Sequence, residues 1–293
     1  MKGNMFLGYA RGSVGDVTFS RTNGQQQARA RNRNPNNPRT SGQMMQRSLF
    51  ANSVKFHTRG VQQLFRFAFE DKASNESDYN AFMKHNMNNG IRISKQASQS
   101  PLYPAFGNWQ MSCGSLKQPE VALMEGGAKW KWSLPSMTSN ASTWGLFMAA
   151  IKKDMNLMEG DIVTFVHILA RNATVNNLPS IEVPEELIST EWNIDQRLVD
   201  SADTTELPAW INTDNGFAVV QHSSTDTDAY AQGLAIITSR KTSSGLKVST
   251  SFLINNSVAN SIIEAAQTPE FVEQILASWD TSAAAILEGS LIP

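Results

Sequence analysis

The stretch Gly233–Ile254, GLAIITSRKTSSGLKVSTSFLI, decides the fold class of this chain. Its two strand-like runs, Gly233–Arg240 and Leu246–Ile254, flank a five-residue connection, Lys241–Gly245, that contains glycine. Two such runs joined by a short glycine-containing loop predict a β-hairpin. Another strong strand is predicted over Ile162–Leu169. The second half of the chain is therefore expected to be rich in strands.

The first forty residues predict a second hairpin, and this one is basic. Val14–Ser20 alternates as a short strand does, Thr22-Asn23-Gly24 suits a tight turn, and Gln25–Arg33 alternates again. The return strand carries a row of arginines on one face: Arg29, Arg31 and Arg33. Asn34–Pro38 ends the strand, because proline cannot donate a hydrogen bond to a ladder.

Helical spacing of apolar residues marks the remaining elements. Helices are expected over residues 41–58, 76–88, 142–155 and 269–279, the first capped by Thr40 or Ser41. The chain is therefore predicted to be α+β: a basic N-terminal β-hairpin and helices, followed by a β-rich, sandwich-like body with peripheral helices. We expect a module over residues 1–98 and a body over residues 99–293.

The charges are distributed unevenly along the chain. Up to Arg66 there are 11 basic residues and one acid, Asp16. The whole chain has 25 basic and 26 acidic residues, so the rest carries 14 and 25, a net charge of −11. A basic arm on an acidic body is expected to bind a polyanion or the acidic body of another copy.

The composition narrows the class of protein. Charged residues make up only 17%, and Ser, Thr, Asn and Gln fill the difference, as is common in β-rich structural and surface proteins. No stretch approaches the roughly 20 apolar residues of a membrane span, and the first apolar run is too short for a signal peptide. We expect a soluble protein that stays in the cytoplasm and does not enter a membrane.

No catalytic pattern is recognisable in the sequence. The four histidines have no metal-ligand spacing, and His167, in a predicted strand, is expected to be a satisfied core or sheet-face residue. Cys113, the single cysteine, excludes an internal disulfide and has no evident histidine partner, so it is expected to be a small buried residue. We therefore expect no enzyme, cofactor, metal site or small-molecule substrate.

The arginines are the best candidate for a functional site. The candidate contacts are Arg21, Arg29, Arg31, Arg33, Arg39 and Arg47. Under one interpretation these side chains contact nucleic-acid phosphates, and release of counterions supplies the affinity. Under the other they pair with acidic patches on a neighbouring subunit, which arginine recognises equally well. Both interpretations assume that the leading arginines are not neutralised within their own module.

The region after the hairpin carries a recognisable motif. The block Asn37-Pro38-Arg39-Thr40, with Gln43, Arg47 and Phe50, follows a Gly-rich strand and a basic return strand. This pattern resembles an uncharacterised family that is widespread in Bacteroidetes bacteria and their phages, and it covers about the first third of the chain. The later SCGSL, Ser112–Leu116, is similar to a recurrent strand motif of that family. The resemblance implies a phage or mobile-element context and no activity.

The motif also has a physical explanation as a structural junction. Pro38 ends the hairpin, Thr40 caps the helix, and Gln43 can close a capping box with Thr40. Arg47 lies one turn further along the same helix face, from which it can reach back toward the preceding loop.

Three functions are consistent with these features. The first is a structural or assembly protein of a phage or mobile-element particle, made in the host cytoplasm and then part of the virion. Its partners would be other copies of the chain or other virion proteins, and its arm would contact neighbouring subunits or packaged nucleic acid. The second is a dedicated nucleic-acid-binding protein, and the third is a surface or receptor-binding module.

Overall fold

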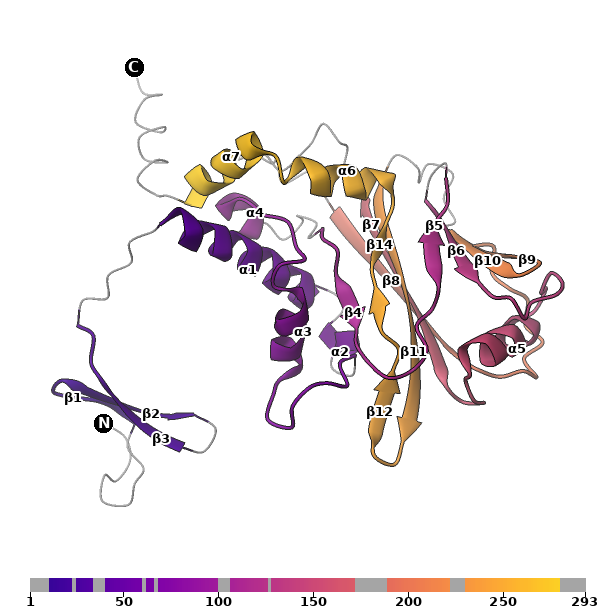
Figure 1. Cartoon of the computed structure of the whole chain (residues 1–293), viewed down its shortest axis with the longest axis horizontal. Helices are drawn as coiled ribbons and strands as arrows, with labels where there is room; N and C mark the ends of the chain where they lie inside the picture. The colour runs from indigo at the N-terminus through magenta and orange to yellow at the C-terminus, as the bar shows by residue number, and fades with distance from the viewer. Residues whose placement is uncertain are drawn as a thin grey trace. The chain divides into compact units, whose positions relative to one another are not determined.

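The computed structural model describes residues 11–22, 25–33, 40–59, 62–65, 68–99, 106–125, 128–171, 189–221 and 230–279 (Figure 1). The chain divides into two units, Met1–Thr40 and Ser41–Pro293. The sequence instead suggested a boundary near residue 98. The helices before that position pack on strands of the same unit, since Phe56 and Phe82 share one core with Val166 and Ile168.

The N-terminal unit is a three-stranded antiparallel sheet in the order β1-β2-β3. Its strands are β1 (Gly12–Val14), β2 (Val17–Thr22) and β3 (Gln25–Ala30). The predicted hairpin is confirmed as β2 and β3. The predicted strand over Val14–Ser20 is wrong in one respect, because a two-residue turn at Gly15-Asp16 divides it, and Val14 pairs with Val17. Gly15 has φ +55°, a conformation that favours glycine.

The largest sheet of the second unit has the strand order β12-β11-β7-β8, and a short strand also pairs with β11. Its strands are β7 (Ile162–Arg171), β8 (Ser189–Leu198), β11 (Ala231–Thr242), β12 (Gly245–Val248) and the short β14 (Ile254–Asn255). The predicted hairpin is confirmed as β11 and β12. Its turn is shorter than expected, because Thr242 pairs with Gly245 and leaves two residues between the strands.

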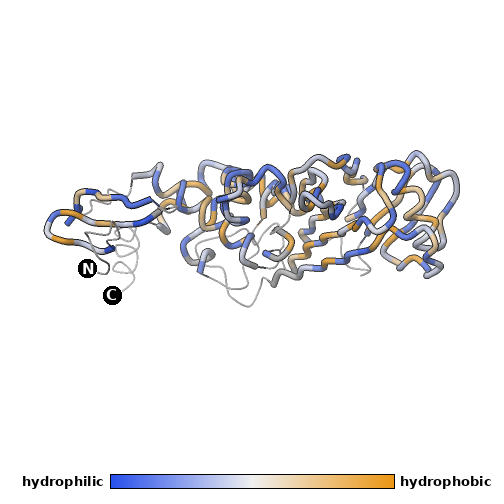
Figure 2. The backbone as a smooth tube through the Cα atoms, turned by 90° about the horizontal axis from the view of Figure 1, so that it is seen from below, coloured by the Kyte–Doolittle hydropathy of each residue, from blue (hydrophilic) through white to orange (hydrophobic). Residues whose placement is uncertain are grey.

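Both faces of this sheet are buried. Val163 and Phe165 of β7 belong to one core cluster, whereas Val166 and Ile168 belong to another. Side chains alternate between the faces of a strand, so a strand that is covered on both sides reads as a nearly continuous apolar run. This explains why the sequence signal over Ile162–Leu169 is so strong. Apolar and polar segments alternate along the strands of this unit in Figure 2.

A smaller sheet and a helix cover one face of the large sheet. The sheet has the order β5-β6-β10-β9, with β5 (Val121–Leu123), β6 (Lys129–Ser133), β9 (Ile211–Asp214) and β10 (Phe217–Gln221). Trp130 and Trp132 of β6 are fully buried, as their alternation with lysines suggests. Helix α5 (Trp144–Met155) completes this layer and is capped by the Thr143 hydroxyl, which accepts from the Leu146 amide. The predicted helix over 142–155 is confirmed.

Helices cover the other face of the large sheet (Figure 1). They are α1 (Ser41–Arg59), α2 (Gln62–Phe65), α3 (Asp78–Asn86) and α4 (Lys95–Gln99), beside a ladder of β4 (Gln110–Ser112) and β13 (Ser251–Phe252). The helices predicted over 41–58 and 76–88 are confirmed, and the Ser77 hydroxyl caps α3. Phe56 stacks on Trp109, with ring centroids 4.4 Å apart.

Two helices end the described chain. Helix α6 (Ser257–Ala265) is capped by Asn256, and α7 (Pro269–Trp279) has the predicted bounds. Both contribute to a third core cluster with Ile91 and Ile93. The α+β class with a β-rich body is confirmed. Among the described helices, none combines the length and the apolar character needed to cross a membrane.

Candidate functional site

The N-terminal sheet carries most of the candidate arginines that the structure describes. Arg21 on β2 lies opposite Gln26, and Arg29 on β3 lies opposite Thr18. Strand β3 ends at Ala30, so Arg31 and Arg33 follow the strand and do not extend its ladder. The prediction of a three-arginine row on one strand face is therefore only partly right. Arg29, Arg31 and Arg33 lie in Gln25–Arg33, a stretch in which every residue is exposed.

One carboxylate lies among these arginines. Arg33 Nη2 donates to Asp16 Oδ1 at 2.5 Å, and the Arg31 amide donates to the Asp16 carbonyl at 2.6 Å. The assumption that the leading arginines have no negative partner in their own module is therefore wrong for Arg33. Both members of that ion pair are mostly exposed, so water weakens it. Arg29 and Arg31 form no ion pair with any carboxylate of the described residues.

The remaining candidates lie in or next to α1. Thr40 directly precedes the first helical residue, where an N-cap residue stands, and Gln43 is exposed in the first turn. The capping box between them stays a prediction. Arg47 is half-buried, with Nη1 3.9 Å from the sulfur of Met44, so the interior of the body partly encloses its side chain. Pro38 and Arg39 lie outside the described residues.

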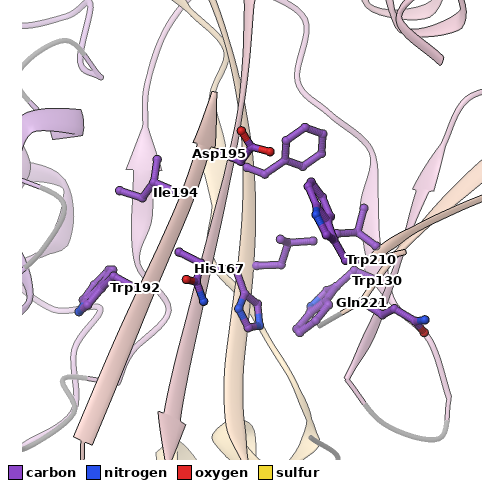
Figure 3. A pocket seen from close by; sticks show the side chains of 11 residues that line it. Trp130, His167, Trp192, Ile194, Asp195, Trp210 and Gln221 are labelled. Carbon is purple, nitrogen blue, oxygen red and sulfur yellow. The ribbon is translucent and has the colours of Figure 1, made fainter. Parts of the chain in front are cut away.

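A cavity of about 500 Å³ lies in the body (Figure 3). Its floor is formed by buried side chains of both sheets, including Trp130 and Phe165. Half-buried side chains also line it, among them His167, Asp195, Trp210 and Gln221. The sequence contained a partial signal in its clustered tryptophans, but the pairing of the strands was needed to bring them together.

Hydrogen bonds hold the polar groups of this cavity in place. His167 Nε2 is 3.0 Å from Oε1 of the buried Gln232, which supports the expectation of a satisfied sheet-face histidine. Arg197 Nε donates to Asp195 Oδ2 at 3.2 Å and also lies over the Trp144 ring, 4.8 Å from its centroid. An aromatic cavity with a few fixed polar groups is typical of a binding site for a small ligand.

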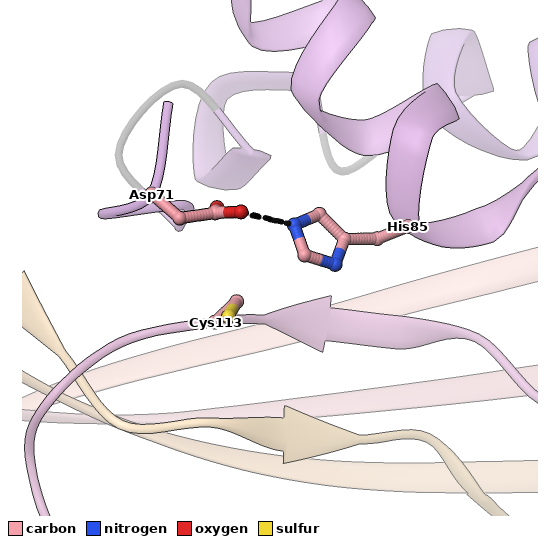
Figure 4. A group of neighbouring side chains, drawn as sticks. All are labelled: Asp71, His85 and Cys113. Atoms are coloured by element: carbon pink, nitrogen blue, oxygen red, sulfur yellow. Dashed lines mark hydrogen bonds and ion pairs between the residues drawn. The ribbon is translucent and has the colours of Figure 1, made fainter. Parts of the chain in front are cut away.

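A third cluster joins Asp71, His85 and Cys113 (Figure 4). One ligand atom from each residue lies within 4.8 Å of the other two. The expectations for Cys113 were wrong: it is half-buried, and His85 lies close to it in space. Burial would raise the pKa of the Asp71 carboxyl, but hydrogen bonds from Lys84 and His85 outweigh it and lower that pKa below its usual value. Asp71 is thus ionised at neutral pH.

Comparison with known proteins finds a similarity to an uncharacterised family over part of the chain. No curated protein and no solved structure shows a significant match. The model of a family of unknown function, DUF6266, matches residues 9–145, slightly less than half of the chain. The matched region covers the N-terminal sheet, the helical layer and the strand carrying Trp130 and Trp132. The first half of the chain therefore resembles a domain to which no function is attached.

Proposed function

We propose that this chain is a structural assembly protein without enzymatic activity, whose N-terminal unit is a docking arm for a neighbouring copy. Particles of phages and mobile elements are built from such repeated subunits, and this chain would be made in a host cytoplasm and then become part of the particle. One observation carries the proposal: the N-terminal sheet has no buried residue among its described positions, and its last strand leads into an arginine-rich stretch.

A sheet of this kind gains little stability by itself. All residues of β1 and β3 are exposed, and among the β2 residues whose burial is described, only Thr18, Phe19 and Ser20 are half-buried. A small sheet needs a hydrophobic face packed on another element to be independently stable. Strands β1 and β3 are also the edges of the described sheet, and an edge strand can pair with a strand of another chain. Docking on a partner would supply both the packing and the pairing.

The charges favour a second copy as the partner. Residues 1–40 contain seven basic residues and one acid, which leaves 18 basic and 25 acidic residues, a net charge of −7, for the rest. Each copy would therefore offer a cationic arm and an anionic body. Arginine can bind a carboxylate through paired hydrogen bonds. Arg33 donates a single hydrogen bond to Asp16. Arg29 and Arg31 present the same chemistry to a neighbour.

The test is the oligomeric state of the full chain, measured by light scattering after size exclusion over a range of concentration and salt. We expect multimers that weaken as the salt concentration rises. Reversing charge in the arm (Arg29→Glu, Arg31→Glu, Arg33→Glu) is expected to yield monomers. The control reverses three exposed lysines of the body, Lys153→Glu, Lys241→Glu and Lys247→Glu, and should keep the multimers.

Nucleic acid is the competing partner, and the same variants separate the two. A wild-type chain that stays monomeric but binds duplex DNA, with the binding lost in the arm variant and weakened by salt, would refute docking between copies. That result would identify a dedicated nucleic-acid-binding protein. Multimers that persist in the arm variant would also overturn the proposal.

The aromatic cavity favours a second candidate, a surface or receptor-binding module. Sugar rings present an apolar face that packs on aromatic side chains and hydroxyl groups that pair with carboxylates and amides. Trp210, Asp195 and Gln221 provide these groups in one cavity. Titration with a panel of oligosaccharides, followed by tryptophan fluorescence, tests this candidate, and Trp210→Ala should abolish any binding. A panel without a response would refute it.

A further inference from the structure

Three potential metal ligands converge from separate parts of the chain. Asp71 follows the bridge residue Phe69, His85 lies on α3, and Cys113 directly follows β4. His85 Nε2 is 3.0 and 3.1 Å from the two carboxylate oxygens of Asp71. Figure 4 shows the Cys113 side chain directed toward this pair. We propose that Asp71, His85 and Cys113 bind a divalent transition-metal ion of the zinc class.

The backbone around these residues is held in place. Phe69 and Cys113 form a parallel bridge, the Cys113 amide donates to the Ala68 carbonyl at 2.8 Å, and the Glu70 amide donates to the Cys113 carbonyl at 2.9 Å. These bonds fix Cys113 beside the segment that carries Asp71. The His85 ring stacks on Phe69, with centroids 5.1 Å apart. The three side chains are therefore positioned before any ion arrives, which lowers the entropy cost of binding.

The donor set selects the metal. A thiolate sulfur, an imidazole nitrogen and a carboxylate oxygen suit zinc and cobalt, whereas magnesium and calcium prefer oxygen alone. Zinc bonds of about 2.0 to 2.3 Å place tetrahedral ligand atoms roughly 3.3 to 3.7 Å apart. The three atoms here lie within 4.8 Å of one another, so rotation of the side chains is enough to close the site. Three protein ligands leave the fourth position for water or another ligand.

Lys84 competes with the metal for Asp71. Lys84 Nζ donates to Asp71 Oδ2 at 3.0 Å, so the carboxylate already has a cationic partner. The lysine side chain is 55% exposed, so it can move into solvent at little cost. A metal ion must displace it from the carboxylate. Removing the ammonium group should therefore strengthen metal binding, which a purely structural ion-pair network would not do.

Cobalt is the probe, because a cobalt–thiolate bond has an intense near-ultraviolet charge-transfer band. The full-length chain without a histidine tag is stripped with a chelator and titrated with Co²⁺, and Zn²⁺ is then added. We expect one Co²⁺ per chain, the thiolate band, and loss of that band as Zn²⁺ replaces Co²⁺. Cys113→Ser should remove the band, and His85→Gln should weaken binding more than about ten-fold. Lys84→Met should tighten it several-fold.

Glu273→Gln is the control, since it removes an exposed carboxylate on α7 that is not part of the cluster and should leave cobalt binding unchanged. Circular dichroism verifies that each variant is folded. A wild-type chain without the thiolate band would overturn the proposal. Cobalt that binds Cys113→Ser as tightly as the wild type would also overturn it, because the ion would then sit elsewhere. If only the alkylation rate of Cys113 responds to His85→Gln, the cluster is an activated thiol and binds no metal.

Discussion

The ion pair between Asp161 and Arg240 is expected to be a main support of the large sheet. Arg240 Nε lies 3.1 and 3.0 Å from the two carboxylate oxygens, and Nη2 lies 2.7 Å from one of them. The Asp161 side chain is only 5% exposed, and that of Arg240 is 18% exposed. The pair joins the start of β7 to the end of β11, whose registers meet at Ile162 and Ser239.

The magnitude follows from what each variant leaves behind. Asp161→Asn keeps the shape but leaves a largely buried guanidinium without its counter-charge. Removing one partner of a buried pair costs about 3 to 5 kcal/mol, and the partial exposure of Arg240 puts the expected loss at about 3 kcal/mol. Lys152→Met breaks an exposed pair with Glu159, 2.6 Å long, and should cost clearly less than Asp161→Asn, because water screens the pair.

Urea unfolding followed by tryptophan fluorescence measures both losses, because all seven tryptophans lie in the second unit. In a double-mutant cycle, Asp161→Asn combined with Arg240→Met should cost less than the sum of the two single changes, by about 2 kcal/mol. If Asp161→Asn cost no more than Lys152→Met, the reasoning from burial would be refuted. Additive single losses would show that the two side chains act independently.

Three further predictions concern single residues of the second unit. Gly145→Ala in α5 should destabilise the chain by about 1 to 3 kcal/mol in the same urea assay, because the added Cβ would stand 2.5 Å from the Asp203 carbonyl oxygen. Gly42→Ala in α1 is the control: its added Cβ has no atom within 4 Å, so this variant should be neutral or slightly stabilising. Burial lowers the pKa of His57 in the folded chain, despite the opposing effect of the Asp78 charge. As the pH falls, His57 is therefore protonated at a higher pH in the unfolded chain than in the folded chain. Stability should therefore fall as the pH drops below about 6.5, and His57→Gln should reduce that slope. Hydrogen bonds from Lys152 and Ser201 lower the pKa of Glu159 to about 2, so the stability that Glu159 contributes is present above about pH 4.5 and lost as the pH falls toward 2. Glu159→Gln should therefore reduce the loss of melting temperature over this pH range, whereas the control Glu273→Gln should not.

The sequence was sufficient to predict a helix or hairpin where the residues that determine it lie within the element itself. Pro269 stands at the first position of α7, after Thr268, and the helix has the predicted bounds. The hairpin of β11 and β12 was likewise predictable, because its turn and all four residue pairs of its ladder lie between Ser239 and Val248. Its turn length was wrong, since the sequence cannot show how far pairing continues into a Ser-rich connection. The predicted second strand, Leu246–Ile254, was wrong as well: β12 ends at Val248, and β13 and β14 follow it and pair with β4 and β11.

The candidate sites could not be predicted in the same way, because they depend on pairings between distant segments. Asp71, His85 and Cys113 meet through the parallel bridge between Phe69 and Cys113, and no spacing along the chain encodes that bridge. The cavity beside Trp130 depends on the pairing of β6 with β10 and of β7 with β8. The arginines of the N-terminal sheet were identifiable because charge is a property of composition, whereas the Asp16 contact of Arg33 required the fold.

Part of the polar composition lies in the interior of the body. Several Ser and Asn side chains are buried there, among them Ser48, Asn52 and Asn86. Asn52 Nδ2 donates to the carbonyls of Ile91 and Phe106, and Asn86 donates to the Gln110 carbonyl and accepts from the Gln110 amide. Such side chains replace the hydrogen bonds of a regular ladder where the backbone is irregular.

The body and the N-terminal sheet differ in how their backbones are stabilised, and this difference concerns the proposed role of the sheet as a docking arm. The body satisfies its irregular segments internally, with buried residues such as Asn52, Asn86 and Ser48, whose hydroxyl donates to the Ile93 carbonyl at 2.9 Å. The described part of the N-terminal sheet contains no buried side chain of any kind, polar or apolar. Its strands are therefore held mainly by their ladder bonds and by one exposed ion pair. Since such bonds contribute only about 1 kcal/mol each when water competes for them, we expect this sheet to gain stability from contacts outside its own unit.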